Sequence, residues 1–117
     1  MSIALDTTIS YFNAWTSGNF DQAIRYLSPA IVCNTPVGTI TGSEAFRGFM
    51  GPFAGSLTSS KLLAAFGDEN TALIMYDSAT TIVADAPGAE LHTVVDGSIT
   101  SITIIFDRQP FQEARSR

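Results

Sequence analysis

The sequence predicts an α+β fold in which helices cover one face of a curved antiparallel sheet. The first half of the chain carries amphipathic helical patterns, whereas the second half has four runs of β-forming residues separated by turns. One of these turns is Asp96-Gly97, a pair that favours a type I′ hairpin. Because consecutive hairpins form an antiparallel sheet, the helices are available to cover one of its faces.

Two helices are expected at the start of the chain. The first spans residues 3–17, where apolar side chains recur at helical spacing, and Gly18 follows as its C-terminal residue. The second begins after Asn19, with Gln22 placed three positions later as in a capping box. Pro29 ends this helix, because the residue before a proline is disfavoured in the helical region.

The next elements are a short β-branched strand at 31–35, a small strand at 39–41 and a third helix that begins near residues 42–43. Four strands then follow in hairpin succession, giving the order α-α-β-α-β-β-β-β. They are expected at residues 58–66, 71–84, 89–95 and 98–106. Residues 108–117 have three arginines and no apolar periodicity, so we expect a solvent-exposed tail on a single domain of residues 1–117.

Composition excludes several classes of function. Of the 117 residues, 45% are hydrophobic and 15% charged, which suits a globular core, and the formal net charge is -5. With no basic stretch, nucleic acid and anionic membrane surfaces are not expected as partners. The one cysteine, Cys33, excludes an internal disulfide, and neither a signal peptide nor an apolar membrane span is evident. These features predict a cytoplasmic location.

Several short motifs, in this order and spacing, resemble the SnoaL-like branch of the nuclear-transport-factor-2-like (ketosteroid isomerase-like) superfamily. They are Tyr11-Phe12-Asn13-Ala14-Trp15, Gly18-Asn19-Phe20-Asp21, Pro36-Val37-Gly38, Gly42-Ser43-Glu44-Ala45-Phe46-Arg47-Gly48-Phe49, Asp96-Gly97-Ser98-Ile99 and Ile105-Phe106-Asp107. The resemblance implies a cone-shaped, cystatin-like fold with a cavity between helices and sheet. The superfamily includes ketosteroid isomerases, limonene-epoxide-hydrolase-like enzymes, polyketide cyclases and non-catalytic binders, so the site must decide the function.

The resemblance implies two positions of interest near the start of the chain. Tyr11 matches an oxyanion-stabilising tyrosine of ketosteroid isomerases, although it can equally close the helix–sheet interface. Thr35 stands where those enzymes carry an aspartate base, and its hydroxyl is too weak a base to replace one.

Asp77 interrupts an apolar strand and faces either the cavity or solvent. The resemblance to limonene-epoxide-hydrolase-like enzymes implies an Asp–Arg–Asp group on the sheet. The strands around Asp77 contain no arginine, so epoxide hydrolysis is not expected.

Glu90 and His92 share one strand face because side chains alternate along a strand. The two side chains are candidates for an acid–base pair that works near neutral pH. The alternative is a lone histidine at a strand edge or a dimer interface. His92 is the one histidine of the chain, so a histidine-cluster metal site is excluded.

The candidate catalytic residues are therefore Tyr11, Asp77, Glu90 and His92, and no cofactor is expected. The candidate ligand-binding residues are Trp15, Thr35, Phe49, Phe53, Met75 and Phe106. One hypothesis is an isomerase or cyclase that moves protons on an apolar carbonyl or polycyclic substrate. The other is a non-catalytic ligand-binding or dimerisation module. For both we expect a small apolar ligand and a homodimer through the outer sheet face, to which Ile74, Val95 and Ile105 are assigned.

Overall fold

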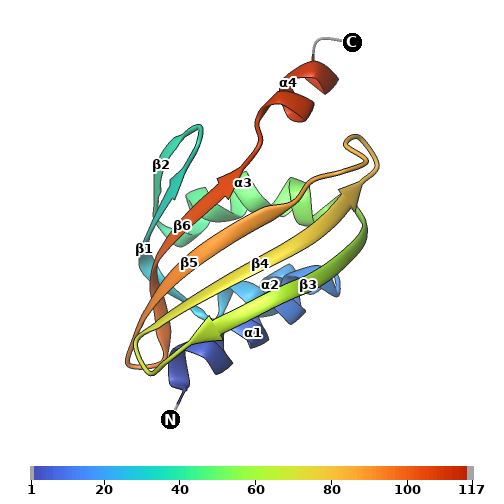
Figure 1. The fold of residues 1–117 in the computed structure, drawn as a ribbon. Helices are drawn as coiled ribbons and strands as arrows, with labels where there is room; N and C mark the ends of the chain where they lie inside the picture. The colour runs from blue at the N-terminus through green and yellow to red at the C-terminus, as the bar shows by residue number, and fades with distance from the viewer. Residues whose placement is uncertain (1, 116–117) are drawn as a thin grey trace.

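Helices and one six-stranded sheet make up the computed structural model, which describes residues 2–115 (Figure 1). The sheet order is β2-β1-β6-β5-β4-β3, and its neighbouring strands are antiparallel except for β1 and β6. The elements, in chain order, are α1 (Ile3–Thr16), α2 (Phe20–Ile24), β1 (Leu27–Thr35), β2 (Gly38–Thr41), α3 (Ser43–Gly55), β3 (Leu57–Gly67), β4 (Thr71–Thr80), β5 (Gly88–Val95), β6 (Ser98–Phe106) and α4 (Gln109–Arg115).

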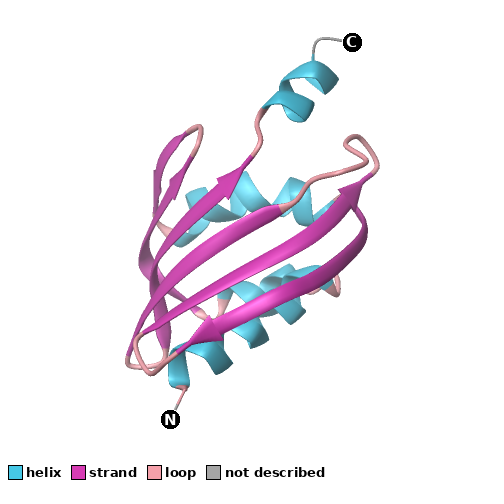
Figure 2. Cartoon of the chain, in the orientation of Figure 1, coloured by secondary structure: helices cyan, strands magenta, loops and turns pink. Residues whose placement is uncertain are grey.

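The sheet is strongly curved, and α1, α2 and α3 lie on one of its faces (Figure 2). Side chains of β4 and β5 alternate between buried and exposed, as expected for strands with one covered face. The largest fully buried side chains include Trp15 and Tyr11 of α1 and Phe46 of α3, which pack between helices and sheet. The predicted α+β class, with helices on one face of a curved sheet, is confirmed.

Local signals in the sequence account for several boundaries. The side chain of Asn19 accepts a hydrogen bond from the backbone N–H of Gln22 at 3.2 Å, so the predicted N-cap of α2 is present. Asp96 and Gly97 both have positive φ, 52° and 79°, as the type I′ turn between β5 and β6 requires.

Three elements in the body of the fold have other bounds than expected. The strand expected at residues 71–84 ends at Thr80. The second helix ends at Ile24, and β1 already begins at Leu27, so that Pro29 lies inside a strand. The pairing of β1 with β6 shifts register between Leu27 and Val32, and this irregularity accommodates a proline that cannot donate a ladder hydrogen bond.

The C-terminal segment also differs. Instead of a simple solvent-exposed tail, residues Gln109–Arg115 form the short helix α4. The ring of Phe111 contacts Phe106 of β6 and Phe53 of α3, with centroids 5.5 Å and 6.2 Å apart. This contact joins α4 to the end of β6 and to α3. No helix within residues 2–115 is long and apolar enough to cross a membrane.

Candidate active site

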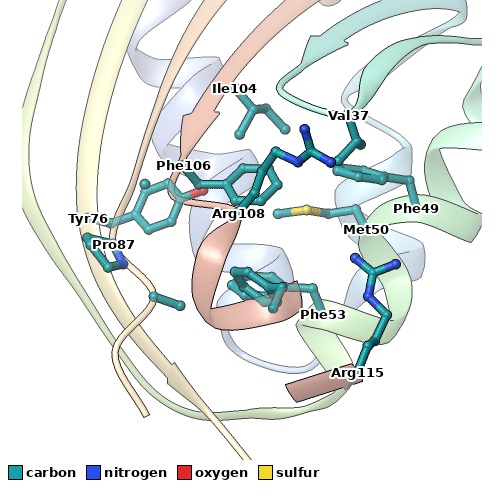
Figure 3. Close-up of a pocket in the computed structure, with 13 residues that line it drawn as sticks. Val37, Phe49, Met50, Phe53, Tyr76, Pro87, Ile104, Phe106, Arg108 and Arg115 are labelled. Carbon is teal, nitrogen blue, oxygen red and sulfur yellow. The ribbon is translucent and has the colours of Figure 1, made fainter. Parts of the chain in front are cut away.

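A pocket of about 330 Å³ opens between α3, α4 and the ends of β4, β5 and β6 (Figure 3). Its volume lies within the ~300–1,000 Å³ of small-molecule sites. Most of its wall is apolar, and among its lining residues the polar side chains are those of Tyr76, Arg108 and Arg115. The lining residues are Val37, Phe49, Met50, Phe53, Tyr76, Ala86, Pro87, Gly88, Ile104, Phe106, Arg108, Phe111 and Arg115.

Tyr76 brings a hydroxyl group to the wall of this pocket. It lies on the covered face of β4, and its register partner on β5 is Gly88. A Cβ atom at position 88 would lie 2.9 Å from the Tyr76 hydroxyl oxygen and 3.0 Å from Cζ. The missing side chain of Gly88 therefore leaves the space that the phenol ring occupies.

A chain of hydrogen bonds leads from Tyr76 into the interior. The Tyr76 hydroxyl donates to Glu90 Oε2 at 2.6 Å, while Glu90 Oε1 lies 2.9 Å from His92 Nε2. On the other side of the imidazole, His92 Nδ1 lies 2.9 Å from Thr8 Oγ1 of α1. Glu90, His92 and Thr8 are each 0% exposed, so the pocket reaches this chain through Tyr76.

The neutral form of His92 can satisfy every group in this series of hydrogen bonds. Burial raises the pKa of Tyr76 well above its ordinary value, and the charge of Glu90 and the hydrogen bond to it raise the pKa further. Tyr76 therefore keeps its proton and donates it to Glu90. Both Glu90 oxygens then face donors if His92 carries its proton on Nε2, and Thr8 donates to the free Nδ1.

Tyr11 and Cys33 are buried in the interior near Glu90 and His92, and neither lines the pocket. The Tyr11 ring meets His92 edge-on, with centroids 5.4 Å apart, and its hydroxyl is buried without a hydrogen-bond partner among the described residues. Burial first, and the charge of Glu90 second, raise the pKa of Tyr11 well above normal and that of Cys33 to about 12. Tyr11 and Cys33 therefore keep their protons near neutral pH.

The structure brings together two of the four predicted catalytic residues by direct contact. Glu90 and His92 form the predicted pair, and Tyr11 packs against it without lining the pocket. Asp77 was expected to face either the cavity or solvent, and the structure places it on the exposed face of β4, opposite Lys61 of β3. It cannot take part in the chemistry of this pocket.

Of the six predicted ligand-binding residues, three line the pocket and three do not. Phe49, Phe53 and Phe106 line the pocket. Trp15 is fully buried behind the wall, where its ring contacts those of Phe53 and Tyr76 at 5.9 Å and 5.5 Å.

Three residue assignments need correction. Met75 is 49% exposed on the outer face, so its assignment to the ligand-binding wall is wrong. Thr35 lies at the β1–β2 turn, where its hydroxyl donates to the carbonyl of Gly38 and accepts from the N–H of Val37. Ile74, assigned above to the outer face, is 0% exposed on the inner one, because helices cover the face that carries Ala72, Ile74 and Tyr76.

Three polar residues of the pocket lining were not among the predicted site residues: Tyr76, Arg108 and Arg115. Tyr76 alternates with Asp77 along β4, and the alternation alone does not say which of the two side chains faces inward. The arginines were counted as part of an exposed tail. Within residues 2–115, no group of three His, Cys, Asp or Glu side chains is placed to hold a metal ion.

Comparisons with known proteins agree with the fold. The family model of the SnoaL-like domain matches residues 9–102. A crystal structure of a protein from Kribbella flavida DSM 17836 is 53% identical, with a TM-score of 0.93 over 97% of this chain and 93% of that chain. None of the curated proteins is a significant match.

More distant structures share the fold. A candidate ketosteroid isomerase from the same organism is 16% identical, with a TM-score of 0.79 over 90% of this chain and 78% of that chain. A candidate polyketide cyclase from Xanthomonas campestris pv. campestris is 20% identical, with a TM-score of 0.73 over 93% of both chains. Since the family model covers most of the chain, this protein belongs to the SnoaL-like family.

Proposed function

We propose that this protein is a cofactor-independent isomerase or cyclase that moves a proton on an apolar carbonyl or polycyclic substrate. The observation that carries the proposal is the 2.6 Å hydrogen bond between the pocket-lining Tyr76 hydroxyl and the buried Glu90 carboxylate. A buried carboxylate is costly unless it is fully hydrogen-bonded, and such groups concentrate at functional sites. Here its hydrogen-bond chain ends at the wall of a small-molecule pocket.

The proposed step is a coupled transfer of two protons. As the C–H bond next to the substrate carbonyl breaks, its proton binds to the Tyr76 oxygen, and its electron pair moves onto the carbonyl oxygen to give an enolate. In the same step the Tyr76 proton passes to Glu90 Oε2. A free tyrosinate, which the raised pKa of Tyr76 disfavours, is thereby avoided.

The reverse transfer completes the reaction. Glu90 returns its proton to Tyr76, and Tyr76 gives one to the substrate. If the proton goes to a different carbon, a double bond has moved and the reaction is an isomerisation. If the enolate carbon has attacked a second carbonyl group, the proton goes to the new alkoxide and the reaction is a cyclisation. In both cases no atom or electron is gained or lost overall.

His92 and Thr8 are positioning residues in this scheme. His92 binds the second oxygen of Glu90, and Thr8 binds the far nitrogen of the ring, which fixes its orientation. The resemblance in fold to a candidate ketosteroid isomerase and a candidate polyketide cyclase supports a reaction of this class, because both names describe chemistry on carbonyl compounds.

Deuterium exchange tests the proposal without knowledge of the product. The protein would be incubated in D₂O with a panel of aryl ketones and aryl 1,3-dicarbonyl compounds, and exchange at the acidic carbon followed by NMR. We expect catalysed exchange of at least one compound, with a loss of roughly 10²–10⁴-fold in Tyr76→Phe and in Glu90→Gln.

Tyr26→Phe is the matched control, because Tyr26 is a half-buried tyrosine outside the pocket lining. Its exchange rate should equal that of the wild type. Exchange that persists in both Tyr76→Phe and Glu90→Gln would refute the assigned roles.

A non-catalytic ligand-binding module is the second candidate. The observation in its favour is that Glu90 and His92 are 0% exposed and do not line the pocket, so neither touches a bound ligand directly. Under this reading an apolar compound binds in the pocket with no exchange. Binding of the same compounds, measured by calorimetry, separates the two candidates.

We also infer a homodimer through the outer face of the sheet. Leu73, Met75, Leu91, Val95 and Ile105 are 43–67% exposed there, on three neighbouring strands. Met75, Ala89 and Ile105 form one continuous cross-strand row, and a second copy would cover such an apolar surface symmetrically. Sedimentation velocity tests this inference: Ile105→Lys should weaken dimers, whereas Ile82→Lys, at an equally exposed loop position, should not. A wild-type monomer at micromolar concentration would refute it.

A further inference from the structure

Two arginines lie at the mouth of the pocket. Arg108 lies in the short connection between β6 and α4, and Arg115 is the last residue of α4; both line the pocket. Figure 3 shows the guanidinium groups of both residues pointing to the side where Phe49 and Met50 of α3 lie. Two positive charges therefore face one apolar space, one from the β6–α4 connection and one from the end of α4.

The positive charge of these two arginines is opposite in sign to the net charge of the protein. The chain has six Lys and Arg residues against eleven Asp and Glu, and its net charge is -5. Two of those six cations nevertheless line the pocket, and no Asp or Glu is among the lining residues. The charged residues of the pocket lining are thus both positive, whereas Asp85, Asp107 and Glu113 line the adjoining hollow that shares Ala86 and Pro87 with this pocket.

No described acidic side chain pairs with either arginine. Asp107 and Glu113 lie nearest in sequence, and both are hydrogen-bonded to Gln109: the Asp107 carboxylate accepts from its backbone N–H at 3.0 Å and Glu113 from its side-chain amide at 3.1 Å. By contrast Arg47, on the exposed side of α3, pairs with Asp21 at 2.7 Å. Arg108 and Arg115 have their guanidinium donors available to a ligand.

We propose that the pocket binds an amphiphilic ligand, an apolar ring body with a carboxylate group, and that Arg108 and Arg115 bind the carboxylate. The proposal rests on the proposed function in taking this pocket as the ligand site, and it narrows the substrate class. The planar guanidinium group matches a carboxylate in shape and donates two parallel hydrogen bonds to it. The phenylalanine rings of the wall contact the apolar body, which extends towards Tyr76.

The geometry of α4 fits this role. Phe111 lies between Arg108 and Arg115 in sequence and packs against Phe53 and Phe106, two other wall residues. The helix is therefore held at the pocket by the same apolar wall that the ligand would contact. A ligand anion between the two arginines would join α4 to the end of β6.

A matched pair of fluorescent probes tests the proposal. The anionic probe is 8-anilinonaphthalene-1-sulfonate, whose sulfonate stands in for the carboxylate, and the neutral probe is N-phenyl-1-naphthylamine, which lacks that group. We expect the wild type to bind the anionic probe more tightly than the neutral one by roughly tenfold or more, as a charge-assisted contact predicts. Arg108→Gln/Arg115→Gln should remove this preference and leave the affinity for the neutral probe unchanged.

Two further variants control for folding and for charge. Arg25→Gln removes an exposed arginine outside the pocket lining and should leave the preference intact. Arg108→Lys/Arg115→Lys keeps both charges and should retain part of it. Thermal melts of all variants verify that the fold is intact, because this anionic probe also binds loosened proteins.

Two results would overturn the proposal. One is an unchanged preference for the anionic probe in Arg108→Gln/Arg115→Gln. The other is an equal loss of affinity for both probes, which would mean that the arginines act only through packing. The proposed proton transfer is tested separately, because Glu90→Gln should abolish deuterium exchange yet keep the preference for the anionic probe. Exchange that survives Glu90→Gln contradicts the catalytic scheme alone.

Discussion

Gly88→Ala tests the geometry of the site with a single methyl group. The new Cβ would lie 2.9 Å from the Tyr76 hydroxyl oxygen, 3.0 Å from Cζ and 3.1 Å from Cε2, so the ring must move. Gly88 does not have a positive φ, and alanine therefore fits the backbone itself. The expected effect is a displaced phenol ring and a broken Tyr76–Glu90 hydrogen bond.

The size of the effect follows from two opposing contributions. A hydrogen bond to a charged group stabilises the native state by about 1.5–3 kcal/mol, and this contribution is lost. Replacing glycine by alanine restricts the unfolded chain and returns about 0.4–1 kcal/mol. We expect Gly88→Ala to lower the free energy of unfolding by about 1–2 kcal/mol, measured by urea unfolding with an unchanged m-value.

Gly48→Ala is the matched control. Gly48 lies on the exposed side of α3, and a Cβ there meets no atom within 4 Å. Alanine in a helix interior should raise stability by about 0.5–1 kcal/mol. In a Tyr76→Phe background, where the hydrogen bond is already absent, Gly88→Ala should cost less than in the wild type. An equal cost in both backgrounds would refute the assignment of the lost stability to this bond.

Two further predictions concern buried groups near Glu90. Tyr11→Phe removes a buried hydroxyl that has no described partner, so we expect unchanged or higher stability in urea unfolding. Tyr76→Phe removes the hydrogen bond to Glu90 and should lower the free energy of unfolding by about 1.5–3 kcal/mol. The reverse order of the two stabilities would contradict these roles. The pKa of Cys33 is raised to about 12 from 9.0, so its contribution to stability is full below pH 9 and is lost as pH rises towards 12. Urea midpoints should fall more steeply from pH 8 to 10.5 in the wild type than in Cys33→Ala, and parallel slopes would exclude the effect.

The fold was predictable where a signal lies within a few neighbouring residues. Asp96-Gly97 fixes a type I′ hairpin, and Asn19 caps α2, because both effects act within one turn of the chain. The parallel pairing of β1 with β6 joins segments about 70 residues apart, and no local pattern encodes it. Helix α4 was missed for the same reason, since Phe111 finds its partners on β6 and α3.

The site was predictable only in part. Period-two alternation placed Glu90 and His92 on one face of a strand, and the structure joins them by a 2.9 Å contact. The same rule separates Tyr76 from Asp77 but does not say which of them faces inward. That choice depends on which face of β4 the helices cover, and this is a property of the whole fold.

The sequence did contain a cue for Tyr76, although its meaning depended on register. A glycine inside a strand often marks the close approach of another group. The sequence pattern predicts that β5 begins at residue 89, whereas the structure makes Gly88 its first residue, with Tyr76 as register partner. Once β4 and β5 are aligned, Gly88 and Glu90 lie on the same face as Tyr76, one beside its ring and the other bound to its hydroxyl. The tyrosine that reaches the pocket is therefore identified by the space left for it on the neighbouring strand, and Asp77, whose side chain lies on the opposite face, has no comparable place.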